Sequence, residues 1–228
     1  MKRDIGPLAS PGSRGRYRVR VLIPYRSLRS AHEVAMRICV FCGSSPGIDP
    51  YYGVAAAAAA RAIAATGATI VYGGGRVGLM GVIADAAMNA GGKVIGVVPR
   101  ALVEREIAHR GLTELHVVET MHERKTKMSE LGDSFMALPG GAGTLEEIFE
   151  QWTWGQLGIH AKPCGFLNIK HYFDPLQAMI TRMVAEGFMI PAFADMVSFS
   201  DQVEALLAAF QSYVPPPRKW SSNDVVKA

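Results

Sequence analysis

The chain has 228 residues, 49% of them hydrophobic, which is enough for one α/β core, and it lacks the run of about 18 apolar residues that a transmembrane helix needs. Its formal net charge of +4 comes from residues 1–35, where eight Lys or Arg accompany two acids, whereas the rest of the chain holds 16 basic and 18 acidic residues. That balance is not the charge of a nucleic-acid-binding protein.

Residues 1–35 lack a hydrophobic period and contain Pro7, Pro11 and Pro24 among scattered Gly and Ser. We predict a poorly ordered, arginine-rich extension. It lacks the long apolar core of a secretory signal. Its many arginines are compatible with a transit peptide, which remains an alternative interpretation. We favour a start site placed too far upstream, with Met36 as the natural start, and we expect a cytoplasmic protein.

From residue 36 onward, short apolar runs alternate with helical segments. Strands are predicted at 37–41, 68–72, 93–98, 115–118, 134–138, 164–169 and 196–200. Helices are predicted at 51–66, 78–89, 120–132, 143–157, 175–186 and 202–213, while 100–114 has no clear period. The alternation indicates a single α/β domain over 36–213, a doubly wound parallel sheet of about six or seven strands, followed by a polar tail at 214–228. Ligands of such a sheet bind beyond the carboxyl ends of its strands.

The three cysteines and the histidines do not form a metal site by their spacing. Cys39 and Cys42 have C-x-x-C spacing, but Cys164 stands alone and no second pair completes a zinc site. We interpret all three cysteines as small apolar residues of the core in a reducing compartment. His122 lacks a second His or Cys at ligand spacing, so no metal is expected.

The loop after the second predicted strand, GGGRVG from Gly73 to Gly78, matches the pattern G-x-G-x-x-G. In dinucleotide-binding proteins this loop follows the first strand, and an acidic residue lies about 20 residues further on. Neither condition holds here, since the third predicted strand leads into Pro99-Arg100. Two interpretations remain open: the glycines let the backbone approach a phosphate or ribose, or they only permit a tight turn and close helix packing.

The loop after the fifth predicted strand, PGGAGT at 139–144, suits an anion. Its glycines allow backbone N–H groups to point into one concavity, and the helix that begins near Gly143 adds its positive end. It is not a Walker loop, because no G-K-[ST] follows. Acids follow instead, and they are also the ordinary complement of a helix N-terminus: Glu146, Glu147 and Glu150.

The helix predicted at 143–157 has one apolar stripe, which should face the core: Leu145, Ile148, Phe149 and Trp152. Glu147 projects nearly opposite this stripe, on the side of Thr144 and Gln151. A carboxylate in the first helical turn has its charged form favoured by the helix dipole. We therefore expect Glu147 to be ionised at neutral pH and to act as a base, or to stabilise a cation, rather than to donate a proton.

The helix predicted at 120–132 carries two cations on its apolar stripe. Arg124 and Lys125 share that stripe with Met121, Met128 and Leu131. Such cations either extend outward to solvent or meet an anion. Because the helix starts just beyond the carboxyl end of a strand, an anionic partner is as reasonable as solvent, and both interpretations remain open.

Several segments together resemble the LOG ("lonely guy") family of cytokinin riboside 5′-monophosphate phosphoribohydrolases, many of which were once labelled lysine decarboxylases. PGGAGTLEE (139–147) matches the family's P-G-G-x-G-T-x-x-E, and MHERK (121–125) resembles its M-H-x-R-K. Further similar segments occur in the family's order at 38–45, 71–81 and 152–160. The resemblance covers about 36–213.

The resemblance implies a Rossmann-like homodimer without a cofactor that hydrolyses the N-glycosidic bond of an N6-substituted AMP, and of AMP itself, to free base and ribose 5-phosphate. It assigns the catalytic pair to Arg124 and Glu147, whereas the residues alone could not choose between Glu146 and Glu147. Its nucleotide-contacting positions match Glu106, Lys125, Gly141, Ala142, Gly143, Thr144, Leu145, Glu146 and Thr153. Loops at strand ends add four further candidates for substrate binding: Ser44, Gly74, Gly75 and Gly140.

In that reaction an ionised Glu147 would stabilise the oxocarbenium-like sugar and activate water, and Arg124 would fix the carboxylate or bind the anionic substrate. Three alternatives stay open. One is a pyridoxal-phosphate-dependent lysine decarboxylase, for which Lys125 or Lys162 would have to form the Schiff base without a recognisable setting. The others are a nucleotide-binding or carrier module without turnover, and a general nucleoside-monophosphate glycosidase.

Overall fold

The structure is a computed structural model that describes residues 35–105 and 107–218. Over this part of the chain seven strands form one sheet in the order β4-β3-β2-β1-β5-β6-β7, and all neighbours are parallel. The strands are β1 (Arg37–Phe41), β2 (Thr69–Tyr72), β3 (Lys93–Pro99), β4 (Glu114–Val118), β5 (Ser134–Ala137), β6 (Cys164–Leu167) and β7 (Val197–Ser200). The predicted parallel sheet is confirmed, including its seventh strand.

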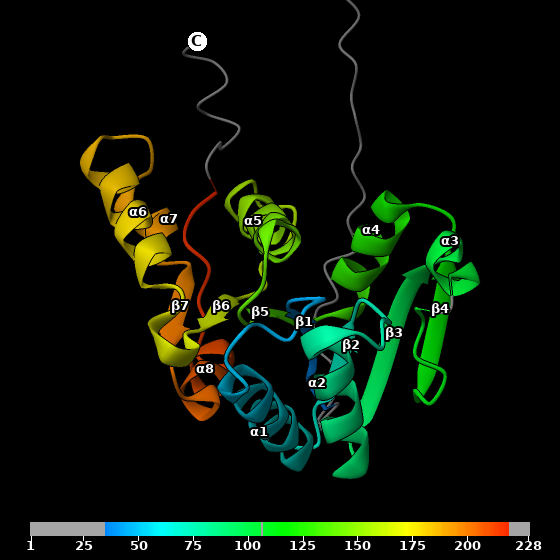
Figure 1. Ribbon diagram of the computed structural model, residues 1–228. Coiled ribbons are helices and arrows are strands. Elements are labelled where there is room, and N and C mark those ends of the chain that lie inside the picture. Colours follow the sequence, from blue (N-terminus) through cyan, green and yellow to red (C-terminus); the bar gives the residue numbers. More distant parts are fainter. Residues whose placement is uncertain (1–34, 106, 219–228) are drawn as a thin grey trace, which may run out of the picture. The chain divides into compact units, whose positions relative to one another are not determined.

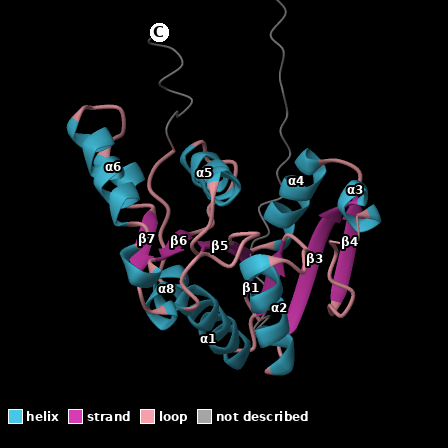
Figure 2. Ribbon diagram, in the orientation of Figure 1, coloured by secondary structure: helices cyan, strands magenta, loops and turns pink. Residues whose placement is uncertain are grey.

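Helices cover both faces of the sheet, with α1, α2 and α8 on one side and α4, α5 and α6 on the other (Figures 1 and 2). Three short elements were not predicted: α3 in the segment 100–114, the 3-10 turn η1 and α7. The bounds are α1 (Tyr51–Ala65), α2 (Gly78–Asn89), α3 (Arg100–Glu104), α4 (Met121–Leu131), α5 (Ala142–Gln156), η1 (Ile169–His171), α6 (Asp174–Ala185), α7 (Pro191–Ala194) and α8 (Val203–Gln211).

The strands form the centre of the core because helices bury both of their faces. Alternate residues of β1 show this: Ile38 and Val40 pack with α1, α2 and α8, while Cys39 and Phe41 pack with α4 and α5. All three cysteines of the chain are free and buried, which confirms their interpretation as core residues. In the described part of the chain, no helix has the length and apolarity to cross a membrane.

The caps of α4 fix where this helix starts. The side chain of Thr120 accepts a hydrogen bond from the Glu123 N–H at 3.1 Å, as the capping-box spacing predicts. The Glu123 carboxylate accepts in return from the N–H of Glu119 at 3.0 Å, one residue before the usual position. The proposed extension and tail fall largely on 1–34 and 219–228, outside the described residues, and 214–218 has no helix or strand.

The strand order places two loops side by side. β1 has β2 on one side and β5 on the other, so the direction in which strands are added reverses between β1 and β5. At such a switch point the loops that leave the carboxyl ends of the two strands diverge and leave room for a ligand. The Gly43 N–H donates to the Pro139 carbonyl at 3.0 Å and ties these two loops together.

Candidate active site

Arg124 of α4 and Glu147 of α5 form a buried ion pair. Arg124 Nη1 lies 2.8 Å from Glu147 Oε1, and the two side chains are only 9% and 12% exposed. The Arg124 Nε also donates to the carbonyl of Val97 in β3, at 3.2 Å. The structure thus brings the two predicted catalytic residues together. It also decides the question left open for Arg124, which meets an anion rather than extending to solvent.

Gly73, at the end of β2, makes room for this pair. A Cβ added at Gly73 would lie 1.8 Å from Arg124 Nη2, so any other residue would collide with the guanidinium. Gly78 has a φ of 56° and packs against the backbone of Ser44, where a Cβ would lie 2.3 Å from the Ser44 carbonyl carbon. At both glycines the structure shows close packing, one of the two interpretations left open. The role of Gly73 toward Arg124 was missed, because nothing local in the sequence relates the two.

Burial raises the pKa of Glu147, and the nearby Arg124 offsets this only in part. The expectation that Glu147 is ionised at neutral pH stays a prediction, but the helix dipole is not what sets its pKa. α5 begins at Ala142, so Glu147 lies beyond the first turn, where the dipole has little effect. The side of α5 that carries Glu147 is also covered, since Thr144 and Gln151 are buried along with the predicted core residues Ile148 and Trp152. Desolvation is what raises the pKa.

Lys125 lies beside the pair and bonds two other acids of α5. Its Nζ contacts Glu146 at 2.5 Å and Glu150 at 3.1 Å, and the bond to Glu146 raises the pKa of Lys125. Lys125 therefore also meets anions. Glu146 is 55% exposed, in contrast to Glu147, and this difference separates two adjacent carboxylates that the residue pattern could not. The predicted apolar stripe of α4 is wrong at Met121, which is 49% exposed.

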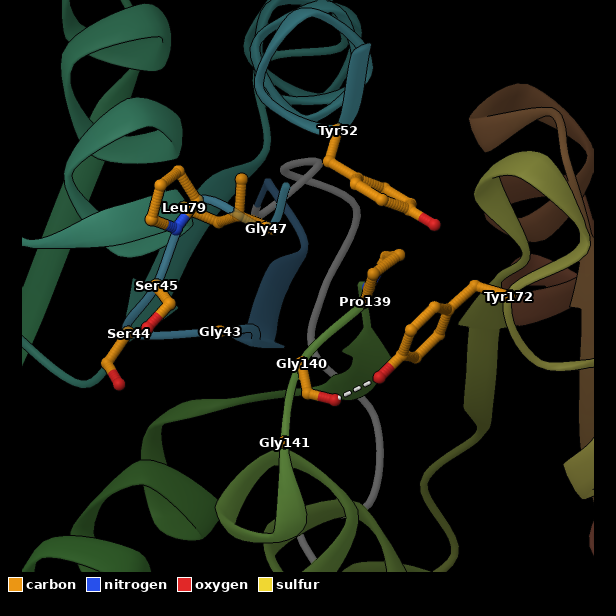
Figure 3. Close-up of a pocket in the computed structure, with 11 residues that line it drawn as sticks. Gly43, Ser44, Ser45, Gly47, Tyr52, Leu79, Pro139, Gly140, Gly141 and Tyr172 are labelled. Atoms are coloured by element: carbon orange, nitrogen blue, oxygen red, sulfur yellow. Dashed lines mark hydrogen bonds between the residues drawn. The ribbon is translucent and has the colours of Figure 1, made fainter. Parts of the chain in front are cut away.

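A cavity of about 300 Å³ lies at the switch point, between the loops that follow β1 and β5 (Figure 3). Gly43, Ser44 and Ser45 line one side, Gly140 and Gly141 lie beside the start of α5, and two tyrosines, Tyr52 and Tyr172, form a wall. The first N–H groups of a helix have no partner within the helix and lie at its positive end. A Cβ at Gly141 or Gly143 would meet nothing within 4 Å, so the surface in front of α5 is open. This end of α5 is suited to a phosphate.

The other predicted binding residues differ in their relation to the cavity. Ser44 and Gly140 line the cavity, with Ala142, Gly143 and Leu145 close by in the first turn of α5. Thr144 is buried and supports the loop, because a Cβ at Gly140 would lie 2.1 Å from its Oγ1. Away from the cavity, Gly74 packs on β3, Gly75 lies against Met80, and Thr153 is an exposed residue of α5. Glu106 lies outside the described residues.

Three features define the class of protein: a helix end that is suited to a phosphate, a parallel sheet with its cavity at the switch point, and a buried Arg–Glu pair. They are those of a Rossmann-like protein with an enzyme-like site. A strongly desolvated carboxyl group beside a specific cation is typical of a group that acts in acid–base or electrostatic catalysis.

Comparison with known proteins identifies the family. The family model described as "possible lysine decarboxylase" matches residues 80–210. The cytokinin riboside 5′-monophosphate phosphoribohydrolase of Rhodococcoides fascians is 50% identical over 183 residues, which cover 80% of this chain and 92% of that protein. The enzyme of the same name from Arabidopsis thaliana, LOG1, is 44% identical over 187 residues, covering 82% and 88%. The chain belongs to the LOG family of cytokinin riboside 5′-monophosphate phosphoribohydrolases.

Solved structures agree on the fold. The molybdenum cofactor carrier protein of Chlamydomonas reinhardtii superposes with a TM-score of 0.59 at 21% identity, covering 78% of this chain and 96% of that one. The molybdenum cofactor binding protein of Rippkaea orientalis gives 0.59 at 18% identity with the same coverage. At these identities the likeness shows the Rossmann-like architecture alone.

Proposed function

We propose that this protein hydrolyses the N-glycosidic bond of cytokinin riboside 5′-monophosphates, which are N6-substituted AMP derivatives, and of AMP, giving the free base and ribose 5-phosphate. The shared name of the relatives supports this reaction. The observation that carries the proposal is the buried Arg124–Glu147 pair next to the open N-terminus of α5.

The separation along α5 suits a ribose 5-phosphate. From Ala142 to Glu147 the helix rises by about 7 to 8 Å, which is comparable with the overall length of a ribose 5-phosphate. With the 5′-phosphate at the helix end, the Glu147 carboxylate faces the anomeric carbon. As the bond to the base breaks, positive charge develops on the sugar, and a carboxylate stabilises this charge and accepts a proton from the attacking water.

Arg124 gives Glu147 its chemistry. Burial favours the neutral form of the carboxyl group, and the guanidinium at 2.8 Å opposes this effect. The balance keeps the ionised form accessible in a site with little water, where its charge acts on the sugar with little screening. Arg124 is thus a catalytic residue through its contact with Glu147 and through its charge next to an anionic substrate.

The proposal includes a cytoplasmic homodimer. The free, buried cysteines fit a reducing compartment. Large apolar side chains remain exposed around α6 and α7 and are available to an interface: Met179, Phe188 and Ile190.

The experiment is incubation of the protein with AMP and with an N6-isopentenyl AMP, followed by chromatography for the free base. In Glu147→Gln the size of the side chain is kept and the charge is lost, so kcat should fall by roughly 10²-fold or more while AMP still binds. Glu146→Gln is the matched control, because the same charge is removed from an exposed neighbour, and its loss should be much smaller. Near-normal turnover in Glu147→Gln, above all beside an inactive Glu146→Gln, would contradict the assignment.

The environments of the two candidate Schiff-base lysines, Lys125 and Lys162, do not favour the decarboxylase alternative. A Schiff-base lysine acts through a lowered pKa, whereas the two carboxylates beside Lys125 raise its pKa. Lys162 is desolvated and its pKa is lowered, but it precedes β6 at the amino end of the sheet and donates to the Ser129 carbonyl at 2.6 Å. An absorbance band from bound pyridoxal phosphate would revive this alternative.

A further inference from the structure

The loop that leads into α5 has three carbonyl groups next to the proposed phosphate position, and each has a donor. The Pro139 carbonyl accepts from the Gly43 N–H at 3.0 Å, and the Gly141 carbonyl accepts from the Leu145 N–H at 3.3 Å. The Gly140 carbonyl accepts from the hydroxyl of Tyr172 at 2.6 Å (Figure 3). A carbonyl oxygen carries negative partial charge and repels a phosphate. With its carbonyls engaged elsewhere, the loop presents its N–H groups to an anion.

Tyr172 is the one side chain among these three donors, and it comes from a segment 32 residues further along the chain. The two residues before it, Lys170 and His171, have φ values of 53° and 60°, which are uncommon for residues other than glycine. Lys170 forms an ion pair with Asp49, just before α1. The Asn168 side chain accepts from the Phe173 N–H at 2.6 Å. The segment is therefore held on both sides of Tyr172.

The ring of Tyr172 is also fixed by aromatic contacts. It meets Tyr52 of α1 edge-on, with 6.0 Å between ring centroids, and Phe173 at 5.0 Å. Both tyrosine rings form the wall of the cavity, and the Tyr172 hydroxyl points toward the loop (Figure 3). A held ring with a directed hydroxyl can set the orientation of a flexible glycine loop, which has no side chains of its own to do so.

We propose that Tyr172 is a positioning residue for the 5′-phosphate. Its hydroxyl engages the Gly140 carbonyl, which removes a repulsive group from the phosphate site and holds the loop so that the N–H groups at the start of α5 receive the anion. This inference rests on the proposed function. Because Tyr172 acts on the phosphate end and not on the scissile bond, its effect falls on KM for phosphorylated ligands and not on kcat.

The test is Tyr172→Phe, which removes the hydroxyl and keeps the ring. Loss of this hydrogen bond should raise KM for AMP roughly three- to tenfold with kcat nearly unchanged. The inhibition constant for ribose 5-phosphate should rise by the same factor, whereas kcat/KM for adenosine, which lacks the phosphate, should stay as in the wild type. Tyr51→Phe is the matched control, since Tyr51 is an exposed neighbour outside this cavity.

Each outcome decides the proposal. An unchanged KM for AMP in Tyr172→Phe, or equal losses toward AMP and adenosine, would overturn it. If the wild-type protein cleaves neither AMP nor N6-isopentenyl AMP, the proposed function fails. Calorimetric titration with ribose 5-phosphate then decides the role of Tyr172 by itself: weaker binding by Tyr172→Phe supports it and equal binding overturns it. If Tyr172→Phe does not fold, Asp49→Asn takes its place, because it weakens the ion pair with Lys170 that holds the segment of Tyr172. For the proposal to stand, Asp49→Asn must raise KM for AMP and the inhibition constant for ribose 5-phosphate.

Discussion

The space around Gly73 makes one methyl group a direct probe of the catalytic pair. In Gly73→Ala the new Cβ would lie 1.8 Å from Arg124 Nη2 and 2.9 Å from its Cζ. Contacts of a Cβ below 3.0 Å essentially never occur, so the Nη2 group must move by at least 1.2 Å, the difference between 3.0 and 1.8 Å. Because the guanidinium is planar and rigid, this move also shifts the Nη1 and Nε atoms that bond Glu147 and Val97.

The expected magnitudes follow from that displacement. If Nη1 moves away from Glu147 by the same amount, the 2.8 Å bond between Arg124 and Glu147 lengthens to about 4 Å, at which it no longer counts as a hydrogen bond. Misplacing a catalytic group by about 1 Å costs on the order of 10²-fold in rate, so kcat should fall by about 10- to 100-fold. Loss of a charge-assisted hydrogen bond should lower the free energy of unfolding by about 1.5 to 3 kcal/mol.

The pH dependence makes the assay specific. Arg124 lowers the pKa of Glu147, so displacing it raises that pKa further. If ionised Glu147 is required, the acidic limb of kcat/KM for AMP should move to higher pH in Gly73→Ala. Gly53→Ala, in α1, is the control for the substitution itself, because its Cβ would meet nothing within 4 Å, and it should leave the pH profile in place.

A double-mutant cycle separates this explanation from a general disturbance of the loop. Once Arg124 is removed by Arg124→Ala, the added methyl group of Gly73→Ala meets only the flexible end of Met80, whose Cε lies 2.8 Å from the added Cβ and can move aside. The second change should therefore cost little. Two results would refute the reasoning: near-normal turnover of Gly73→Ala with an unmoved acidic limb, or fully additive losses in the double mutant.

Three further predictions concern the rest of the chain. Burial lowers the pKa of His160 to about 4 from the usual 6.5, so the unfolded chain binds a proton before the folded one does. Stability is therefore full above pH 6.5 and is lost as pH falls toward 4, by about 3 kcal/mol. Urea unfolding at pH 7 and pH 4.5 should show a smaller loss in His160→Gln than in the wild type. A chain that begins at Met36 should fold and turn over AMP as the full chain does, and insoluble protein would contradict this. Sedimentation equilibrium at micromolar concentration should give the mass of a dimer, and a 24.6 kDa species alone would count against it.

Most of the fold could be predicted because parallel strands covered on both faces are continuous apolar runs, and because residues such as Gly67 and Gly132 mark the helix ends. The missed elements, α3, η1 and α7, have five, three and four residues, too few to show a helical period. The left-handed backbone has no signal in the sequence at Lys170 and only a weak one at His171, since histidine adopts a positive φ more often than most residues but far less often than glycine. It is held by tertiary contacts, among them the ion pair of Lys170 with Asp49.

At the site, the sequence indicated candidate catalytic residues but not their contacts with one another. The period of α4 placed Arg124 on a buried face, yet its partner depended on how α4 and α5 pack across the end of the sheet. The same packing determines the pKa of Glu147, through burial rather than through the helix dipole. A helix dipole contributes about 0.3 to 1 kcal/mol and only near the helix end, whereas desolvation depends on every segment that covers the carboxyl group. Burial therefore dominates the pKa of Glu147, and Arg124, given space by Gly73 and held by the Val97 carbonyl, limits its rise. In the proposed reaction, the limited rise of the Glu147 pKa is what leaves a carboxylate facing the sugar cation. Gly73, which gives Arg124 its space, is therefore as necessary to the chemistry as Arg124 itself.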